Sequence, residues 1–231
     1  MHFETWEPVY EAILADFGYD RSADRRARDT LAAILRSDQT FSPPDLSVSG
    51  RCVAVAGAGP TLESDVELAR RADAVFAAST AADRLEACDV GVDCMVTDLD
   101  KNPGTVREFA DSGIPVAVHA HGDNIPAIDR EVPELHPASV IPTTQAAPVY
   151  PVRNFGGFTD GDRAAFLADA VGAGRLLFPG WSFDDSSVDD EKAHKLVWAE
   201  RLLRWLERRR DERFAVLDGR RDTIEMDRLP V

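Results

Sequence analysis

Beyond Gly50 the sequence alternates short apolar runs with longer amphipathic segments, and this rhythm constrains the fold more than any other feature. Each run has the length of a buried strand, and each intervening segment can form a helix that crosses back over a sheet. We therefore expect an α/β fold, with a mostly parallel sheet flanked by helices. The predicted strands are residues 52–57, 74–79, 93–97, 115–119 and 175–178, and the predicted helices are residues 61–71, 102–109, 162–171 and 189–210.

The two ends of the chain depart from this rhythm. Residues 1–45 hold two amphipathic segments, which end at Gly18 and before Ser42-Pro43-Pro44, so we expect an N-terminal helical arm over 1–45 and an α/β catalytic domain over 46–231. Near the other end, apolar residues flank Asp218-Gly219, a dipeptide typical of tight turns. A C-terminal β-hairpin is predicted there.

The charge balance narrows the range of partners. Asp and Glu number 41 against 26 Lys and Arg, for a net charge of -15, and only three of the basic residues are lysines. So acidic a surface repels nucleic acid and anionic membranes, and we interpret it as adaptation to high salt. The expected partners are small molecules, and homo-oligomerisation stays open.

Other features of the sequence favour a cytoplasmic protein. No stretch approaches the roughly 20 apolar residues that span a bilayer, and Met1-His2-Phe3-Glu4 lacks the basic and apolar start of a signal peptide. Cys52, Cys88 and Cys94 are odd in number and form no Cys-x-x-Cys pair. We expect buried free thiols rather than disulfides or a zinc site.

Four groups of unusual residues each follow a predicted strand. They are Gly57-Ala58-Gly59-Pro60, Ser79-Thr80, Asp98-Leu99-Asp100 and His119-Ala120-His121-Gly122-Asp123-Asn124. In open parallel sheets ligands bind outside the carboxyl ends of the strands, so these groups are expected to line one crevice. The glycine turn either presents backbone N–H groups to an anion or is only a tight strand-to-helix turn.

Two of these groups suggest metal chemistry. Asp98 and Asp100 can turn into the same crevice and share a hard cation, although a pair of helix-capping carboxylates is the simpler alternative. His119, His121 and Asp123 alternate along extended chain and point to one side. They form either a transition-metal site of the binuclear hydrolase kind, or a site in which Asp123 contacts Mg²⁺, His121 binds phosphate or substrate, and His119 is structural.

A loop rich in glycine and aromatic residues spans 154–163. Asn154, Phe155, Asp160 and Asp162 can stack a flat heterocycle and bind its edge, whereas Thr159 or Asp160 can equally cap a helix. Gln145 and Lys195 are weaker candidates. An acidic protein without a phosphate-binding lysine loop holds polyphosphate through metal ions on its aspartates, which favours Mg²⁺-dependent phosphate chemistry.

These motifs together resemble one family. Gly57-Ala-Gly59-Pro60, Val96-Thr-Asp98-Leu-Asp100, the His119 to Asn124 block, Thr144-Gln145 and the Asn154 to Arg163 block occur in the order found in archaeal 6-hydroxymethyl-7,8-dihydropterin pyrophosphokinases. The resemblance implies a thiamin pyrophosphokinase-like fold and Mg²⁺-dependent transfer of pyrophosphate from ATP to the pterin, releasing AMP, on a route to folate or methanopterin. One departure is Ala78-Ser79-Thr80-Ala81, where relatives tend to carry Ala-Asp-Gly-Ala.

The resemblance also assigns roles to residues. Asp98, Asp100 and Asp123 become metal ligands, and with His121 they form the expected catalytic group. The resemblance implies that Gly57 and Gly59 line the nucleotide, and we further expect Pro60, Ser79, Thr80, Asp162, Arg163 and Lys195 to bind it. Pterin binding is assigned to Asn124, Gln145, Asn154, Phe155 and Asp160. The alternatives are the metallohydrolase and a nucleotide-binding module without turnover.

The salt interpretation gives a direct prediction. Because molar KCl screens repulsion between the excess carboxylates, the melting temperature of the protein should rise with KCl concentration. Thermal unfolding followed by circular dichroism at increasing KCl tests this. A melting temperature that stays flat or falls would remove the interpretation.

Overall fold

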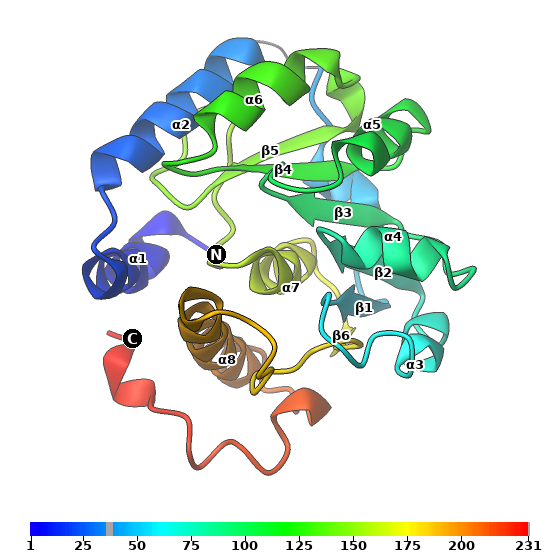
Figure 1. Cartoon of the computed structure of the whole chain (residues 1–231), viewed down its shortest axis with the longest axis vertical. Coiled ribbons are helices and arrows are strands. Elements are labelled where there is room, and N and C mark those ends of the chain that lie inside the picture. The colour runs from blue at the N-terminus through cyan, green and yellow to red at the C-terminus, as the bar shows by residue number, and fades with distance from the viewer. Residues whose placement is uncertain (36–38, 231) are drawn as a thin grey trace.

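The computed structural model describes residues 1–35 and 39–230, which fold around a six-stranded sheet (Figure 1). All strand pairs are parallel, and the order across the sheet is β5-β4-β3-β2-β1-β6. The predicted α/β fold with a parallel sheet is confirmed. The strands are β1 (Cys52–Ala56), β2 (Ala74–Ala78), β3 (Cys94–Thr97), β4 (Val116–Ala120), β5 (Val140–Thr144) and β6 (Arg175–Leu177).

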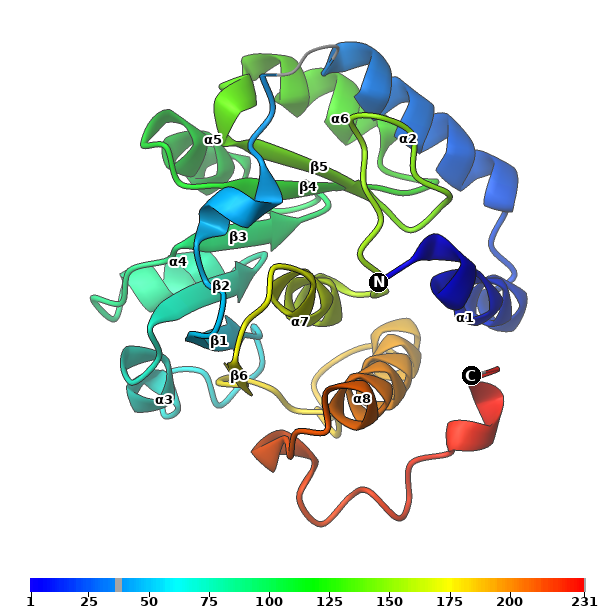
Figure 2. The ribbon, with the colours of Figure 1, turned by 180° about the vertical axis from the view of Figure 1, so that it is seen from behind.

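Helices cover both faces of the sheet, as the two views from opposite sides show (Figure 2). One face carries α1 (Phe3–Phe17), α7 (Asp160–Ala170) and α8 (Asp190–Arg210). The other carries α2 (Arg21–Ile34), α3 (Val66–Arg70), α4 (Ala81–Glu86), α5 (Pro103–Asp111) and α6 (Ile125–Glu131). Within the described residues, no helix combines the length and apolarity needed to cross a membrane.

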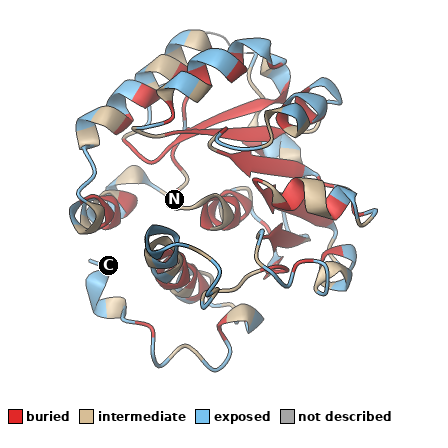
Figure 3. Ribbon diagram, in the orientation of Figure 1, coloured by how far each residue is buried: buried red, intermediate tan, exposed pale blue. Residues whose placement is uncertain are grey.

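The buried strands explain why two separate cores form. Side chains alternate along a strand, so Val53 and Val55 of β1 pack under α7 and α8, whereas Ala54 and Ala56 face the opposite helices. Figure 3 shows β2, β3, β4 and β5 buried throughout, whereas most of the helices are buried only on their inner sides. This explains why the strands read as continuous apolar runs in the sequence.

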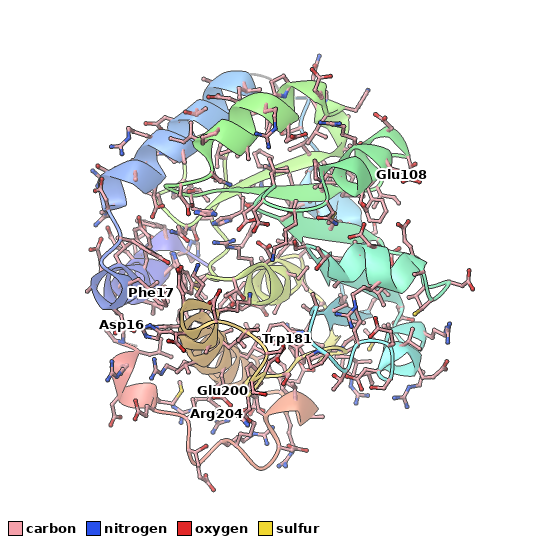
Figure 4. All side chains as sticks on the ribbon, in the orientation of Figure 1. Asp16, Phe17, Glu108, Trp181, Glu200 and Arg204 are labelled. Atoms are coloured by element: carbon pink, nitrogen blue, oxygen red, sulfur yellow. The ribbon has the colours of Figure 1, made fainter. Side chains whose placement is uncertain are left out.

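The first two helices lie on opposite faces of the sheet. The chain leaves α1 at Gly18, whose φ of 69° suits glycine, and then enters α2. The Trp6 indole is fully buried and donates a hydrogen bond to the Gln145 carbonyl at 3.0 Å. At the other end of α1, the Asp16 carboxylate accepts a 2.7 Å hydrogen bond from Trp198 of α8 (Figure 4). Because α1 packs into one core and α2 into the other, the first two helices contribute to both cores.

Strand β5 was missing from the sequence prediction, and its composition explains why. Pro142 lies in the middle of the run, and proline argues against a central strand because it has no N–H to donate. In the structure β5 is at the edge of the sheet, and Pro142 lies opposite Val118 of β4. At this position the missing N–H of proline removes no hydrogen bond from between the inner strands. An edge strand is the position that tolerates this residue.

The predicted C-terminal β-hairpin is wrong. Within residues 211–230 the structure has two short 3₁₀ turns, Ala215–Leu217 and Met226–Arg228, and no strand. Phe214 and Leu217 are buried while Ala215 is exposed, a spacing of three that a strand cannot present to one face. The segment wraps α8, and Arg221 holds it there through an ion pair of 2.6 Å with Glu207.

The tail therefore contributes to stability. Replacing Phe214 by alanine should lower the free energy of unfolding by about 3–5 kcal/mol, because the ring is fully buried against Phe178 at 4.7 Å between centroids. Val216→Ala, at a half-buried neighbouring position, should cost much less. Urea denaturation measures both. Equal stabilities of the two variants would contradict this packing.

Candidate active site

A cavity of about 960 Å³ opens at the carboxyl ends of the strands. Its walls come from the loops after β1 to β6, the first turn of α7, the start of α8 and the corner between α1 and α2. Loops that lie far apart in the sequence meet here because parallel strands all end at one edge of the sheet.

Most of the predicted site residues line this cavity. Those that do so are Gly57, Gly59, Ser79, Thr80, Asp98, Asp100, His121, Asp123, Gln145, Asp160, Arg163 and Lys195. Five predicted residues do not line it: Pro60, Asn124, Asn154, Phe155 and Asp162.

The glycine turn after β1 packs against the loop after β6. The Gly57 and Gly59 N–H groups donate to the carbonyls of Pro179 and Gly180 at 3.0 and 2.8 Å. A Cβ at Gly59 would lie 2.6 Å from the Gly180 carbonyl oxygen, so this close approach requires glycine. The turn lines the cavity, but these two N–H groups are already bonded and do not face an anion.

Ser79 offers a hydroxyl instead. It has a φ of 47°, and its Oγ is buried at the cavity with no hydrogen-bond partner among the described side chains and backbone groups. A buried hydroxyl without a partner is costly unless a ligand or water satisfies it. Ser79 is therefore placed to bind a ligand.

Asp98 and Asp100 leave β3 as a closely coupled pair. The intervening Leu99 has a φ of 67°, and this left-handed turn directs both carboxylates to the cavity. Burial raises the pKa of Asp98, but hydrogen bonds from His121 and Asp100 outweigh burial and bring it well below its ordinary value. Burial and the hydrogen bond with Asp98 raise the pKa of Asp100 to about 6. The pair thus concentrates negative charge that favours a proton or a cation.

His121 lies between two carboxylates. Its Nε2 is 3.3 Å from Asp98 Oδ2, and its Nδ1 is 2.6 Å from Asp123 Oδ1. Burial lowers the pKa of His121, but hydrogen bonds with Asp123 and then Asp98 outweigh burial and raise it to about 9. At neutral pH the ring is an imidazolium that donates from both nitrogens.

His119 has a different environment. Its Nδ1 is 3.0 Å from Thr143 Oγ1, and burial followed by the charge of Arg163 lowers its pKa well below the usual value, so the ring is neutral. The centroids of the two histidine rings are 6.2 Å apart. Across residues 1–35 and 39–230, no three His, Cys, Asp or Glu side chains are placed to hold a metal ion together. The geometry does not support a histidine-rich binuclear centre.

A further carboxylate, that of Asp160, faces the cavity from the first turn of α7. Asp160 Oδ1 accepts a hydrogen bond from Arg163 Nη1 at 2.9 Å. Burial, followed by the negative charge of Asp98, raises the pKa of Asp160 to about 7. A carboxyl group with this pKa can accept and release a proton near neutral pH.

Three of the predicted residues that do not line the cavity stabilise its walls through hydrogen bonds. Asn124 donates to the carbonyls of Asp98 and His119 at 2.8 and 2.7 Å, which fixes the loops after β3 and β4 side by side. Asn154 likewise donates to the Gln145 carbonyl at 2.8 Å. Asp162 forms a capping box with Thr159 and is fully buried. For Asp162, the alternative interpretation of this loop as the start of a helix is therefore the correct one.

The sequence prediction missed Asp24, which is almost fully buried on α2. Its carboxylate accepts hydrogen bonds from Tyr10 at 2.7 Å, Gln145 Nε2 at 2.9 Å and the Gly122 N–H at 2.7 Å. Gln145 Oε1 in turn accepts from Arg163 at 3.3 Å. The network joins α1 and α2 to the loop that carries His121 and, through Gln145, to Arg163 of α7. The signal was a charge on the buried face of α2, in line with Ala27 and Leu31.

Trp181 was also missed, although it too follows a strand. Its indole donates to the Val55 carbonyl at 2.8 Å and is in contact with Phe178. A Cβ at Gly161 would lie 2.8 Å from the Trp181 ring, so the ring lies directly against the start of α7. Trp181, labelled in Figure 4, thus forms an aromatic wall of the cavity next to α7.

The fold and this cavity define an open parallel α/β protein with an acidic ligand site at the strand ends. A family model described as 6-hydroxymethylpterin diphosphokinase MptE-like matches residues 32–187, more than half of the chain. The chain belongs to this family, and the resemblance found in the sequence motifs is confirmed.

Named relatives match along almost the whole chain. The protein from Methanothermobacter thermautotrophicus is 40% identical over 230 residues, covering 92% of this chain and 98% of the relative. Relatives from Pyrococcus furiosus and Methanocaldococcus jannaschii are 36% and 31% identical, and cover 89% of this chain and 94% and 96% of their own lengths. All three are named 6-hydroxymethyl-7,8-dihydropterin pyrophosphokinase.

The Asp24 network predicts a local effect of mutation. In Asp24→Asn the amide NH₂ must face a donor, because three donors converge on the carboxylate. We expect a loss of about 1–3 kcal/mol in the free energy of unfolding and lower hydrogen-exchange protection of the Gly122 amide. Tyr10→Phe is the matched control, since it removes one donor but leaves the Gly122 bond. Unchanged Gly122 protection in Asp24→Asn would refute the role.

Proposed function

We propose that this protein transfers a diphosphate group from ATP to the hydroxymethyl oxygen of 6-hydroxymethyl-7,8-dihydropterin, giving AMP and the pterin diphosphate. The names of relatives that match over nearly the whole chain support this activity. The observation that carries it here is one cavity of about 960 Å³ that gathers Asp98, Asp100, Asp160 and the cationic His121. Its volume suits two small molecules at once.

Mg²⁺ is the cation that the donor set fits. Mg²⁺ is usually bound through one or two carboxylates together with substrate phosphates, so it does not require three protein ligands. Asp98 and Asp100 would hold it, since their coupled carboxylates carry charge that a cation would neutralise. When bound, Mg²⁺ neutralises phosphate oxygens. Asp123, a third expected ligand, is bonded to His121 and its side chain is 86% exposed, so we give it the role of holding His121.

The chain's own residues orient the reactants. His121 and Arg163 are cations at the centre of the cavity. Both N–H groups of His121 face carboxylates, so His121 acts on phosphate oxygens through its charge, whereas the guanidinium of Arg163 can also donate hydrogen bonds to them. Asp160, with its pKa near 7, accepts the proton of the hydroxymethyl group as that oxygen attacks the β-phosphorus. The bond from the β-phosphorus to the oxygen bridging the α-phosphate breaks, and AMP leaves with that oxygen. Positioning and charge stabilisation carry most of the rate increase.

Neither alternative function has an observation in its favour. A binuclear metallohydrolase needs several His, Asp or Glu ligands around its metal ions, and no three such side chains are placed together within residues 1–35 and 39–230. In a binding module without turnover, the adjacent carboxylates of Asp98 and Asp100 would have no role in a reaction. We also place the protein in the cytoplasm of a salt-adapted cell, on a route to folate or methanopterin.

One assay tests the proposal. At high KCl with Mg²⁺, ATP and reduced hydroxymethylpterin, AMP and the diphosphorylated pterin should appear in equal amounts, and EDTA should abolish both. Thiamine as acceptor should give no AMP. AMP formation without a pterin product, or ATP-independent phosphate release, would overturn the assignment.

The Asp98→Asn variant tests whether this carboxylate acts in turnover rather than in folding. Loss of one carboxylate from the coupled pair should lower kcat at least about 100-fold, the scale of losses when one electrostatic stabiliser is removed. Asp123→Asn should also lower kcat at least about 100-fold, because His121 loses the carboxylate that helps hold its charge. Circular dichroism checks folding. Wild-type turnover by either folded variant would refute its assigned role.

A further inference from the structure

The placement of lysine in this protein is uneven. The chain has three lysines, Lys101, Lys192 and Lys195, and all three line the cavity. The lining comprises 34 of the 231 residues, so random placement would bring fewer than one lysine there. Of the 23 arginines, Arg163 is the one that lines the cavity among those the structure describes. The site thus concentrates a residue type that the rest of the chain avoids.

Arginine serves where the protein pairs its own charges. Arginines form the ion pairs with Glu63, Asp184 and Glu207, among many others. The planar guanidinium suits such fixed pairs, whereas an ammonium is a compact charge on a flexible stem with three donors. A flexible cation is better suited to a ligand that enters and leaves.

Lys101 and Lys192 differ from Lys195 in their contacts. Lys195 Nζ forms a 2.7 Å ion pair with Glu191, and Glu191 also accepts a hydrogen bond from Tyr19 at 3.0 Å. Lys101 and Lys192 are exposed, and neither ammonium has an ion pair with a carboxylate of the described residues. Glu191 therefore joins α8 to the corner between α1 and α2, and Lys195 pairs with it on the same helix, while the other two ammonium groups remain available.

These two lysines lie on different walls. Lys101 directly follows Asp100 in the loop after β3, and Lys192 is in the first turn of α8. The glycine turn has its Gly57 and Gly59 N–H groups bonded elsewhere, so it does not supply the charge that an incoming polyphosphate requires. Many of the other charged side chains around the cavity are carboxylates.

We infer that Lys101 and Lys192 bind the phosphate groups of a polyphosphate ligand from two sides of the cavity. The inference rests on the proposed function in that ATP is the polyphosphate. It adds two cations that the motifs of the sequence did not single out, and it limits Lys195 to a positioning role. Polyphosphate charge is then shared between a divalent cation at Asp98 and Asp100 and these two ammonium groups.

The test measures binding and turnover separately. Isothermal titration calorimetry with Mg²⁺ present uses inorganic tripolyphosphate and ATP, with adenosine as the ligand without phosphate. Lys101→Met and Lys192→Met should each weaken tripolyphosphate and ATP binding about 10-fold, and the double variant about 100-fold, as for lost charge-assisted contacts. Adenosine binding should stay unchanged. The KM for ATP should rise in parallel, and Lys→Arg should recover most of the loss.

Arg208→Met is the matched control. It removes one positive charge from an exposed position on the same helix, 16 residues from Lys192 and so roughly 24 Å away. An equal loss of tripolyphosphate affinity in this variant, or unchanged affinity in the double lysine variant, would overturn the inference. If wild-type protein makes pterin diphosphate and the double variant keeps the wild-type KM for ATP, the lysine assignment alone fails. If lysine-dependent tripolyphosphate binding is seen without pterin diphosphate, the proposed function alone fails.

Discussion

The close grouping of carboxylates from the ends of β3 and β4 and from the first turn of α7 is the constraint on which the rest of the site depends. Asp98, Asp100 and Asp160 are brought together in a protein that already carries a net charge of -15, so they repel one another. The protein answers this repulsion locally. His121 becomes a cation between Asp98 and Asp123, Arg163 pairs with Asp160, and Asp100 takes up a proton more readily than an ordinary carboxyl group. Such a concentration of carboxylates favours a proton or a cation.

Buried hydrogen bonds keep that centre in place. Asn124 fixes the loop of Asp98 against the loop of His121, and Asp24 connects both α1 and α2 to Gly122 and Gln145. Because α1 and α2 lie on opposite faces of the sheet, the site is anchored in both cores. The N-terminal segment also lines the cavity at the corner between α1 and α2, so a helical segment that carries no motif shapes the site directly.

Physical reasons separate what the sequence could predict from what it could not. Five strands were predicted because their apolar runs reflect burial on both faces, whereas Pro142 concealed β5. The hairpin prediction failed because a turn dipeptide says nothing of what its flanks pack against, and Phe214 and Leu217 pack on α8. Strand-end position correctly brought Asp98, Asp100 and His121 to one cavity. It could not show that Asn154 and Asp162 point into the wall, since both are hydrogen-bonded to backbone there.

The two ends of the cavity differ in the way a two-substrate transfer requires. At the β1 and β6 end, glycine backbones touch and Trp181 provides an aromatic surface. At the β5 end, Gln145 and Asp24 form a buried polar network that holds its donors and acceptors in fixed directions. The carboxylates and His121 lie after β3 and β4, between these ends in the strand order. The order of the strands thus places the charged side chains after β3 and β4 in the middle of the cavity. A group that passes between ligands at its two ends must cross this charged region.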